Sequence, residues 1–353
     1  MIPYWLLFIF PAFKALERPK ERWNNQTSIL IIFILSLFIG LRHEVGRDWG
    51  NYLHYLNFVR GTELFEGKAG KELLFFMISK LSLFFNFGVY GINMFSAVIF
   101  SSGLIYFCRS LTRQWLALTI SIPYIVIAVG MGYTRQSISL GILMIGIVFL
   151  SKGKKLVFLA LTIFNSFLQL TGLVSLFLLV PYLFKIRKLT NKIVYLVVSL
   201  IIFRVFYSIF ISKYLIYYIY VYLEQGLSSS GVYIRLFLVC FPSLIFLLTG
   251  HKLSLNENEK IIWKTISYFS LLLIPVVFIL PSTTAVDRLA LYALPIMIFT
   301  FSSIPELKFV KINKTLLNCL VITFSFAIQF VWLNYASNAF AWLPYQNILF
   351  RLN

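Results

Sequence analysis

The chain has 353 residues, of which 60% are hydrophobic and only 12% are charged. Soluble domains carry roughly 25% charged residues, so this composition excludes an ordinary water-soluble globular protein. The net charge of +19 does not indicate nucleic-acid binding, because no soluble basic domain accompanies it and basic residues in membrane proteins mainly mark cytoplasmic loops.

Apolar runs recur along the whole chain, separated by short basic segments. Because a bilayer core about 30 Å thick needs about 20 apolar residues per helix, we predict an all-α integral membrane protein, a polytopic bundle of about 12 transmembrane helices. The first run, Met1–Phe13, lacks the basic start and the cleavage site of a signal peptide and is expected to be the first span. We treat 1–353 as a single transmembrane domain, with spans predicted at 1–13, 27–41, 87–108, 115–132, 137–150, 156–168, 171–184, 193–212, 232–250, 261–280, 289–304 and 315–335.

The loops between these spans form two alternating sets that differ in their number of basic residues. One alternating set holds eighteen Lys and Arg residues and the opposite set holds ten, six of which lie in the single segment 42–86. Short basic loops face the cytoplasm in most membrane proteins. Both termini and the segment 42–86 are therefore expected on the outer side, which is the periplasm in a cell with two membranes.

The outer side has one long loop, 42–86, and a smaller one, 213–231. Within the long loop, apolar and aromatic residues alternate with polar ones over Asp48–Val59, which predicts an amphipathic helix lying at the membrane interface. A second interfacial or re-entrant helix is expected at Lys71–Phe85.

The runs 156–168 and 171–184 are each too short for a full crossing and meet at Gln169. Short helices that meet at membrane depth usually line a cavity rather than lipid. We therefore expect Gln169 to face a polar cavity.

Several arginines lie at or near the outer ends of the predicted spans: Arg42, Arg47, Arg135, Arg235 and Arg288. A charge in this position costs several kcal/mol of free energy unless it forms an ion pair or binds a ligand. Because a guanidinium grips phosphate oxygens through a planar fork and stays charged, their convergence would suit an anionic ligand such as a lipid-linked pyrophosphate. The alternative for each arginine is that it snorkels to lipid headgroups or neutralises a neighbouring acid.

Two carboxylates accompany these arginines, and each has two interpretations. Gly46 permits a tight turn that would present Asp48 as the N-cap of the following helix; alternatively, Asp48 is an acid that accepts a proton or orients a basic partner. Asp287 is either a ligand-binding residue or only the salt-bridge partner of its neighbour Arg288. His43 is either a base or a solvated loop residue.

Several familiar signatures are missing from the sequence. It has no DxD, HExxH, P-loop or GxSxG motif, so metal-dependent, nucleotide-hydrolysing and serine-esterase chemistry lack support. The three cysteines have neither metal-ligand spacing nor the pattern of a disulfide framework. We predict no metal site and no cofactor.

At these residues the chain resembles the EpsG-type branch of the Wzy polymerases, which build O-antigen and exopolysaccharide. The resemblance extends over nearly the whole chain as an ordered series of patterns. The chain departs from the family at one position: many members have a histidine in the turn between the short helices, where this chain has Gln169. This departure argues against a histidine at this place as the catalytic base. The patterns are Arg42-(x)3-Gly46-Arg47-Asp48-Trp49-(x)2-Tyr52, Arg135-Gln136-Ser137-Ile138-Ser139-Leu140-Gly141, the short helices around Gln169, Tyr233-Ile234-Arg235, Asp287-Arg288-Leu289-Ala290-Leu291-Tyr292 and Trp342-Leu343-Pro344-Tyr345-Gln346-Asn347.

The resemblance implies a metal-independent membrane glycosyltransferase of the GT-C type in the bacterial inner membrane. Such an enzyme would transfer a growing glycan from undecaprenyl pyrophosphate to another lipid-linked repeat unit on the periplasmic face, with the bilayer and a chain-length regulator as partners. By this resemblance, Arg135 and Arg288 would hold the donor pyrophosphate, and Asp48 would activate or orient the acceptor. The supporting substrate-binding residues would be Arg42, Arg47, Tyr52, Gln136, Gln169, Arg235, Asp287 and Tyr292.

Two other functions stay open from the sequence. An O-antigen ligase uses the same kind of lipid-linked donor as a polymerase, so the arginines do not distinguish the two enzymes. A transporter or flippase for lipid-linked glycans would predict internal repeats between the two halves, and the second half has no counterpart of 42–86.

Overall fold

A computed structural model describes residues 1–62, 72–184, 228–229, 231–280, 282–307 and 313–350. This part of the chain is helical, with one isolated bridge between Arg42 and Asn347 in place of any named strand. The principal helices are α1 (Ile2–Glu17), α2 (Asn25–Gly40), α3 (Trp49–Arg60), α4 (Leu73–Phe84), α5 (Gly88–Ser110), α6 (Gln114–Ser121), α7 (Thr134–Ser151), α8 (Lys155–Leu168), α9 (Val180–Phe184), α12 (Val232–Thr249), α13 (Glu257–Ile279), α14 (Thr283–Ala290), α15 (Pro295–Ser303) and α16 (Lys314–Tyr335).

The predicted all-α membrane architecture is confirmed, whereas the expected dozen crossings stay a prediction. Five of the described helices are long and apolar enough to cross a membrane, and a sixth is obtained if the bent pair Thr283–Ala293 and Pro295–Glu306 is counted as one span. Other predicted spans form helices that are too short by this criterion, such as Asn25–Gly40 and Lys155–Leu168. The predicted span 193–212 lies outside the described residues.

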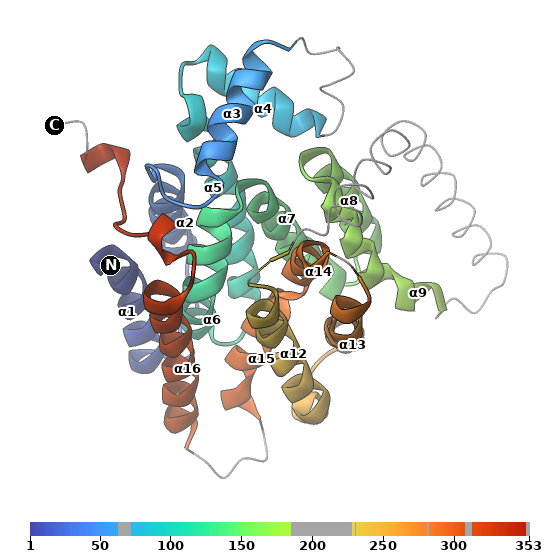
Figure 1. The fold of residues 1–353 in the computed structure, drawn as a ribbon. Helices are drawn as coiled ribbons and strands as arrows, with labels where there is room; N and C mark the ends of the chain where they lie inside the picture. Colours follow the sequence, from blue (N-terminus) through green and yellow to red (C-terminus); the bar gives the residue numbers. More distant parts are fainter. Residues whose placement is uncertain (63–71, 185–227, 230, 281, 308–312, 351–353) are drawn as a thin grey trace.

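The helices form a bundle with two distinct ends (Figure 1). At one end, the Arg22 guanidinium donates to the Leu111 carbonyl, and Glu306 binds both Lys20 and Arg113. These residues belong to three of the basic loops that the charge pattern places together. The contacts therefore show that these basic loops share one end of the bundle.

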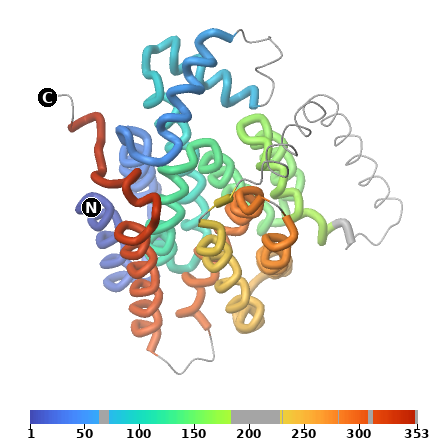
Figure 2. Tube along the Cα trace, viewed as in Figure 1, coloured from blue at the N-terminus to red at the C-terminus, as the bar shows by residue number. Residues whose placement is uncertain are grey.

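The opposite end of the bundle is covered by two short helices, α3 and α4 (Figures 1 and 2). The predicted helices at 48–59 and 71–85 are confirmed as helices, with bounds of Trp49–Arg60 and Leu73–Phe84. Their packing buries Tyr52, Leu56 and Phe75. We call this pair the outer hairpin, because the segment 42–86 is expected on the outer side of the membrane.

The central helices are α5 and α7, which pack closely against each other. In α7, 78% of the apolar window is buried inside the protein, more than in any other described candidate span. Glycines allow this approach, because a Cβ added to Gly103 would lie 2.1 Å from the carbonyl oxygen of Gly141. Small residues at a helix crossing bring the two backbones together, as is common in membrane bundles.

Two helix boundaries depend on local breaks. The short helices α8 and the 3-10 segment Leu170–Leu179 meet at Gln169, as predicted. The predicted start of a helix at 289 is wrong, because α14 begins at Thr283 and bends by 44° before α15. Pro295 lies at the start of α15, where its ring is tolerated and its missing N–H breaks continuity.

The close approach of α5 and α7 predicts that Gly103→Ala destabilises the protein by about 1–3 kcal/mol, since one helix must move away from the other. Thermal unfolding in detergent measures the effect as a lower Tm. Gly50→Ala is the matched control, because a Cβ at Gly50 meets nothing within 4 Å. Equal Tm values for the two variants would contradict the proposed packing.

Candidate functional site

The turn before α3 is built around two residues, Arg42 and Gly46. The buried Arg42 guanidinium donates to the carbonyls of Ile39 and Val45 at 2.5 and 3.1 Å, and to Asn93 and Thr134 at 3.0 and 2.9 Å. Burial lowers the pKa of Arg42 to about 10, so it remains protonated at neutral pH. Arg42 therefore joins α2, α5 and α7 as a structural clamp.

Gly46 has a φ of +96°, in the left-handed region that favours glycine. A Cβ at this position would also lie 2.3 Å from the carbonyl oxygen of Met131, so no residue with a side chain fits here unless the backbone shifts. The predicted tight turn is thereby confirmed. It brings the start of α3 against the segment that leads into α7.

Asp48 lies at the N-cap position of α3 but does not cap it with its side chain. The interpretation of Asp48 as a helix cap is wrong, because its carboxylate instead accepts a hydrogen bond from Asn51 Nδ2 at 3.3 Å. Burial raises the pKa of Asp48, while Asn51, Arg288, Arg135 and Arg42 act in the opposite direction. Three of the predicted arginines thus favour the charged form of this carboxyl group, against the effect of its burial.

Arg135 lies in the first turn of α7 and is bound by Glu72, at the start of α4. Its Nη1 atom is 2.6 Å from Glu72 Oε2, and the Glu72 side chain is only 5% exposed while that of Arg135 is 40% exposed. Glu72 also accepts from the backbone N–H of Leu170 at 3.4 Å, at the break between α8 and the next helical segment. One carboxylate therefore links the outer hairpin, α7 and the break beside Gln169.

Aromatic rings surround the Arg135 guanidinium. It lies 6.0, 5.7 and 5.5 Å from the ring centroids of Tyr52, Tyr55 and Phe75. The Tyr52 hydroxyl also accepts from the Arg135 backbone N–H at 3.1 Å. These contacts from α3 and α4 fix the orientation of Arg135 while its side chain stays partly open.

A neutral polar cluster lies next to this ion pair. The Tyr292 hydroxyl is 3.0 Å from Ser139 Oγ and 2.7 Å from Thr171 Oγ1, and Thr171 accepts from Gln169 Nε2 at 3.0 Å. Leu170, between Gln169 and Thr171, donates its backbone N–H to Glu72 at 3.4 Å, and Tyr292 follows Arg288 by four residues. The cluster therefore adjoins the charged groups above.

Two side-chain oxygens of this region, Gln136 Oε1 and Gln169 Oε1, are buried and lack a hydrogen-bond partner within the described residues. Gln136 precedes Ser139 by three residues on α7, so the two share a helix face. Both oxygens are able to accept hydrogen bonds.

Arg235 and Asp287 form a second ion pair, between α12 and α14. The distance between Arg235 Nη1 and Asp287 Oδ2 is 2.8 Å, and both side chains are buried. Arg235 also donates to the hydroxyls of Tyr124 and Tyr133. The expectation that Asp287 only pairs with its neighbour Arg288 is corrected, since its close partner comes from another helix.

The C-terminal pattern closes over the turn that holds Arg42. Arg47 Nη1 donates to Asn338 Oδ1 at 2.6 Å, and His43 N donates to the Gln346 carbonyl at 3.0 Å. The Trp342 indole donates to the Ile127 carbonyl at 2.8 Å. This tail therefore has an architectural function at the outer end.

Direct contacts thus bring together Arg135, Tyr52, Gln169 and Tyr292 through Glu72 and Thr171, with Gln136 on the adjoining face of α7. Asp48 is linked to Arg135 and Arg288 by charge alone. Arg42 and Arg47 hold the turn before α3, and Arg235 and Asp287 join α12 to α14. Sequence reasoning missed Glu72, Ser139 and Thr171. Glu72 could have been found as a carboxylate bordering the apolar run Leu73–Phe84, where a charge requires a partner.

No three His, Cys, Asp or Glu side chains group as potential metal ligands in the part of the chain that the structure describes. The groups that converge on the site are guanidiniums, carboxyls, hydroxyls and amides. Fixed guanidiniums can stabilise negative charge on phosphate oxygens, and the neutral groups can bind hydroxyls.

Comparison with known proteins gives one match. Residues 27–347 match the model of the EpsG family. No curated protein and no solved structure matches the chain.

The buried pair Arg235–Asp287 predicts that Asp287→Asn destabilises the protein by about 3–5 kcal/mol, because it leaves a buried guanidinium without its counter-ion. Thermal unfolding in detergent measures the loss. The control is Lys260→Gln, which removes an exposed pair with Glu257 and should change stability by less than about 1 kcal/mol. A Tm of Asp287→Asn equal to that of the control would contradict a buried ion pair.

Proposed function

The chain belongs to the EpsG family, and we propose that it is a membrane polysaccharide polymerase that joins repeat units carried on undecaprenyl pyrophosphate. In the proposed reaction, a hydroxyl oxygen of the acceptor repeat unit attacks the anomeric carbon of the donor glycan. The bond between that carbon and the pyrophosphate oxygen breaks, and undecaprenyl pyrophosphate leaves.

The observation that supports this function best is the position of Arg135, a partly exposed guanidinium held by Glu72 and by aromatic rings of the outer hairpin, with Arg288 and Arg42 also among the charges that act on the Asp48 carboxyl group. Arg135 comes from α7, Arg288 from α14 and Arg42 from the turn after α2. Negative charge grows on the departing pyrophosphate, and guanidiniums held in place lower the barrier without reorganising. We assign the donor pyrophosphate to Arg135 and Arg288, and we assign Arg42 to holding the site together.

The neutral cluster supports a glycan subsite next to the charged groups. Amide oxygens such as Gln136 Oε1 and Gln169 Oε1 need hydrogen-bond donors, which sugar hydroxyls supply and an ionised pyrophosphate does not. The hydroxyls of Tyr292 and Thr171 can both donate and accept. We propose that these four side chains orient a sugar beside the reacting carbon.

The two carboxylates at the site differ in their surroundings. Glu72 forms a close ion pair with Arg135 and accepts a hydrogen bond from the backbone N–H of Leu170, so both of its oxygens already have partners within the protein. Burial raises the pKa of Asp48, which lacks such a close pair among the described residues, and this makes it the better base. We propose that Asp48 accepts the proton of the attacking hydroxyl and that Glu72 is a positioning residue.

The basic loops support an orientation for the site. They share the end of the bundle opposite to the outer hairpin, and short basic loops usually remain in the cytoplasm. We propose that the site faces the periplasm, where it meets donors and acceptors anchored in the outer leaflet of the bacterial inner membrane.

Purified protein in nanodiscs, given its cognate undecaprenyl-pyrophosphate repeat unit, is expected to produce a ladder of glycans. Arg288→Gln should lower the rate by about 10²–10³-fold, as expected when a charge-stabilising group is removed. Lys152→Gln, at the opposite end of the bundle, should keep the native rate.

A folded native protein that yields no ladder would contradict polymerisation. Transfer of the glycan to lipid A core in the same assay would indicate a ligase. Movement of the lipid-linked glycan between leaflets, without any ladder, would indicate a transporter.

The assignment of Asp48 as the base predicts a pH dependence. The native rate should rise with pH, because the reactive form is the ionised carboxylate and burial raises the pKa of Asp48 above that of an exposed aspartate. Asp48→Asn should lower kcat by about 10²–10⁴-fold and abolish this rise. A pH profile that keeps its rising limb in Asp48→Asn would contradict the assignment.

A further inference from the structure

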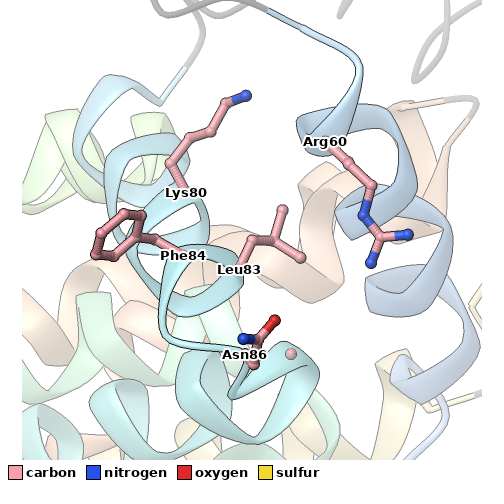
Figure 3. A pocket seen from close by; sticks show the side chains of 6 residues that line it. Arg60, Lys80, Leu83, Phe84 and Asn86 are labelled. Carbon is pink, nitrogen blue, oxygen red and sulfur yellow. The ribbon is translucent and has the colours of Figure 1, made fainter.

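A groove separate from the candidate site opens between α3 and α4. It has a volume of about 530 Å³ and is lined by Arg60, Lys80, Leu83, Phe84, Asn86 and Gly88. Figure 3 shows Arg60 on one helix and Lys80 on the other, with Leu83 between them and Asn86 at the base. The groove thus combines two cations, an amide and apolar surface.

The charges of the groove suit an anionic group. Among the described residues, no ion pair with a carboxylate involves Arg60 or Lys80. The Lys80 ammonium lies 5.8 Å from the Phe76 ring centroid. An arginine and a lysine that line one groove attract phosphate oxygens, and the Asn86 amide can add a hydrogen bond. The groove is therefore complementary to a phosphate in charge.

The position of the groove fits the boundary of a membrane. Gly88, which lines it, is the first residue of α5, a candidate span. Beside it, the side chains of Phe84, Phe85 and Phe87 are 77%, 57% and 60% exposed and contact one another. Aromatic clusters of this kind are stable when they enter the acyl region below the headgroups.

The groove lies away from the proposed chemistry. Asp48 and Arg60 occupy opposite ends of α3, which at 1.5 Å per residue places their backbones about 18 Å apart. A phosphate held by Arg60 and Lys80 would thus not be the pyrophosphate bound by Arg135 and Arg288.

We infer that this groove binds the phosphate headgroup of an anionic phospholipid, with an acyl chain lying along Phe84 and the lipid-facing side of α5. The bound lipid fastens the outer hairpin to the membrane surface. Because the hairpin includes Asp48, Tyr52 and Glu72, this lipid would also hold the site in place. The inference does not depend on the proposed polymerase reaction.

The test uses the photoreactive residue p-azidophenylalanine in place of Phe84, in the full-length protein reconstituted in nanodiscs of equal phosphatidylglycerol and phosphatidylcholine. Cross-linked lipids are identified by mass spectrometry. We expect phosphatidylglycerol to exceed phosphatidylcholine by at least several-fold at this position. The same replacement of Phe95, a lipid-exposed residue farther along α5, is the matched control and should show no preference.

The charges are tested in the Phe84-labelled protein. Arg60→Gln combined with Lys80→Gln should abolish the preference for phosphatidylglycerol, whereas Arg60→Lys combined with Lys80→Arg should keep it. Equal labelling of the two lipids in the unsubstituted groove, or a preference that survives loss of both charges, would overturn the inference. Displacement of phosphatidylglycerol by undecaprenyl pyrophosphate would also overturn it, by assigning the groove to the donor lipid.

Discussion

The ion pair between Glu72 and Arg135 joins three parts of the molecule that the chain keeps far apart. Glu72 starts the second helix of the outer hairpin, Arg135 starts α7, and the backbone of Leu170 completes the contact at the break after α8. Each charge would be costly among apolar helices without its partner. The pair therefore fixes how the hairpin sits on the bundle, and with it the position of Tyr52 against Arg135.

Many contacts at the outer end of the bundle follow from the same requirement, namely that buried polar groups have hydrogen-bond or charge partners. Arg42 uses its donors on backbone carbonyls and on two side chains, and Arg235 uses its donors on two tyrosines and on Asp287. These two arginines stabilise the framework. Arg135 differs from them, because 40% of its side chain is exposed beside the aromatic rings of the outer hairpin, where a ligand can reach it.

The sequence predicted the features that depend on local chemistry. Apolar runs located most described helices, Gly46 predicted the tight turn, and the short runs on either side of Gln169 predicted the break. The features that it did not predict depend on contacts between distant segments. Asp48 does not cap its helix, Asp287 pairs with Arg235 across two helices, and Glu72 reaches Arg135 sixty-three residues away. No pattern of spacing within one segment contains such pairings.

We propose that the pyrophosphate of a lipid-linked glycan binds between Arg135 and Arg288. Electron cryomicroscopy would test it most directly, using the protein in nanodiscs with a bound antibody fragment and an unreactive analogue of the lipid-linked repeat unit. Pyrophosphate density is expected in contact with both guanidiniums, and density for the first sugar is expected against Gln136, Gln169 and Tyr292. Pyrophosphate density elsewhere, such as between Arg60 and Lys80, would contradict it.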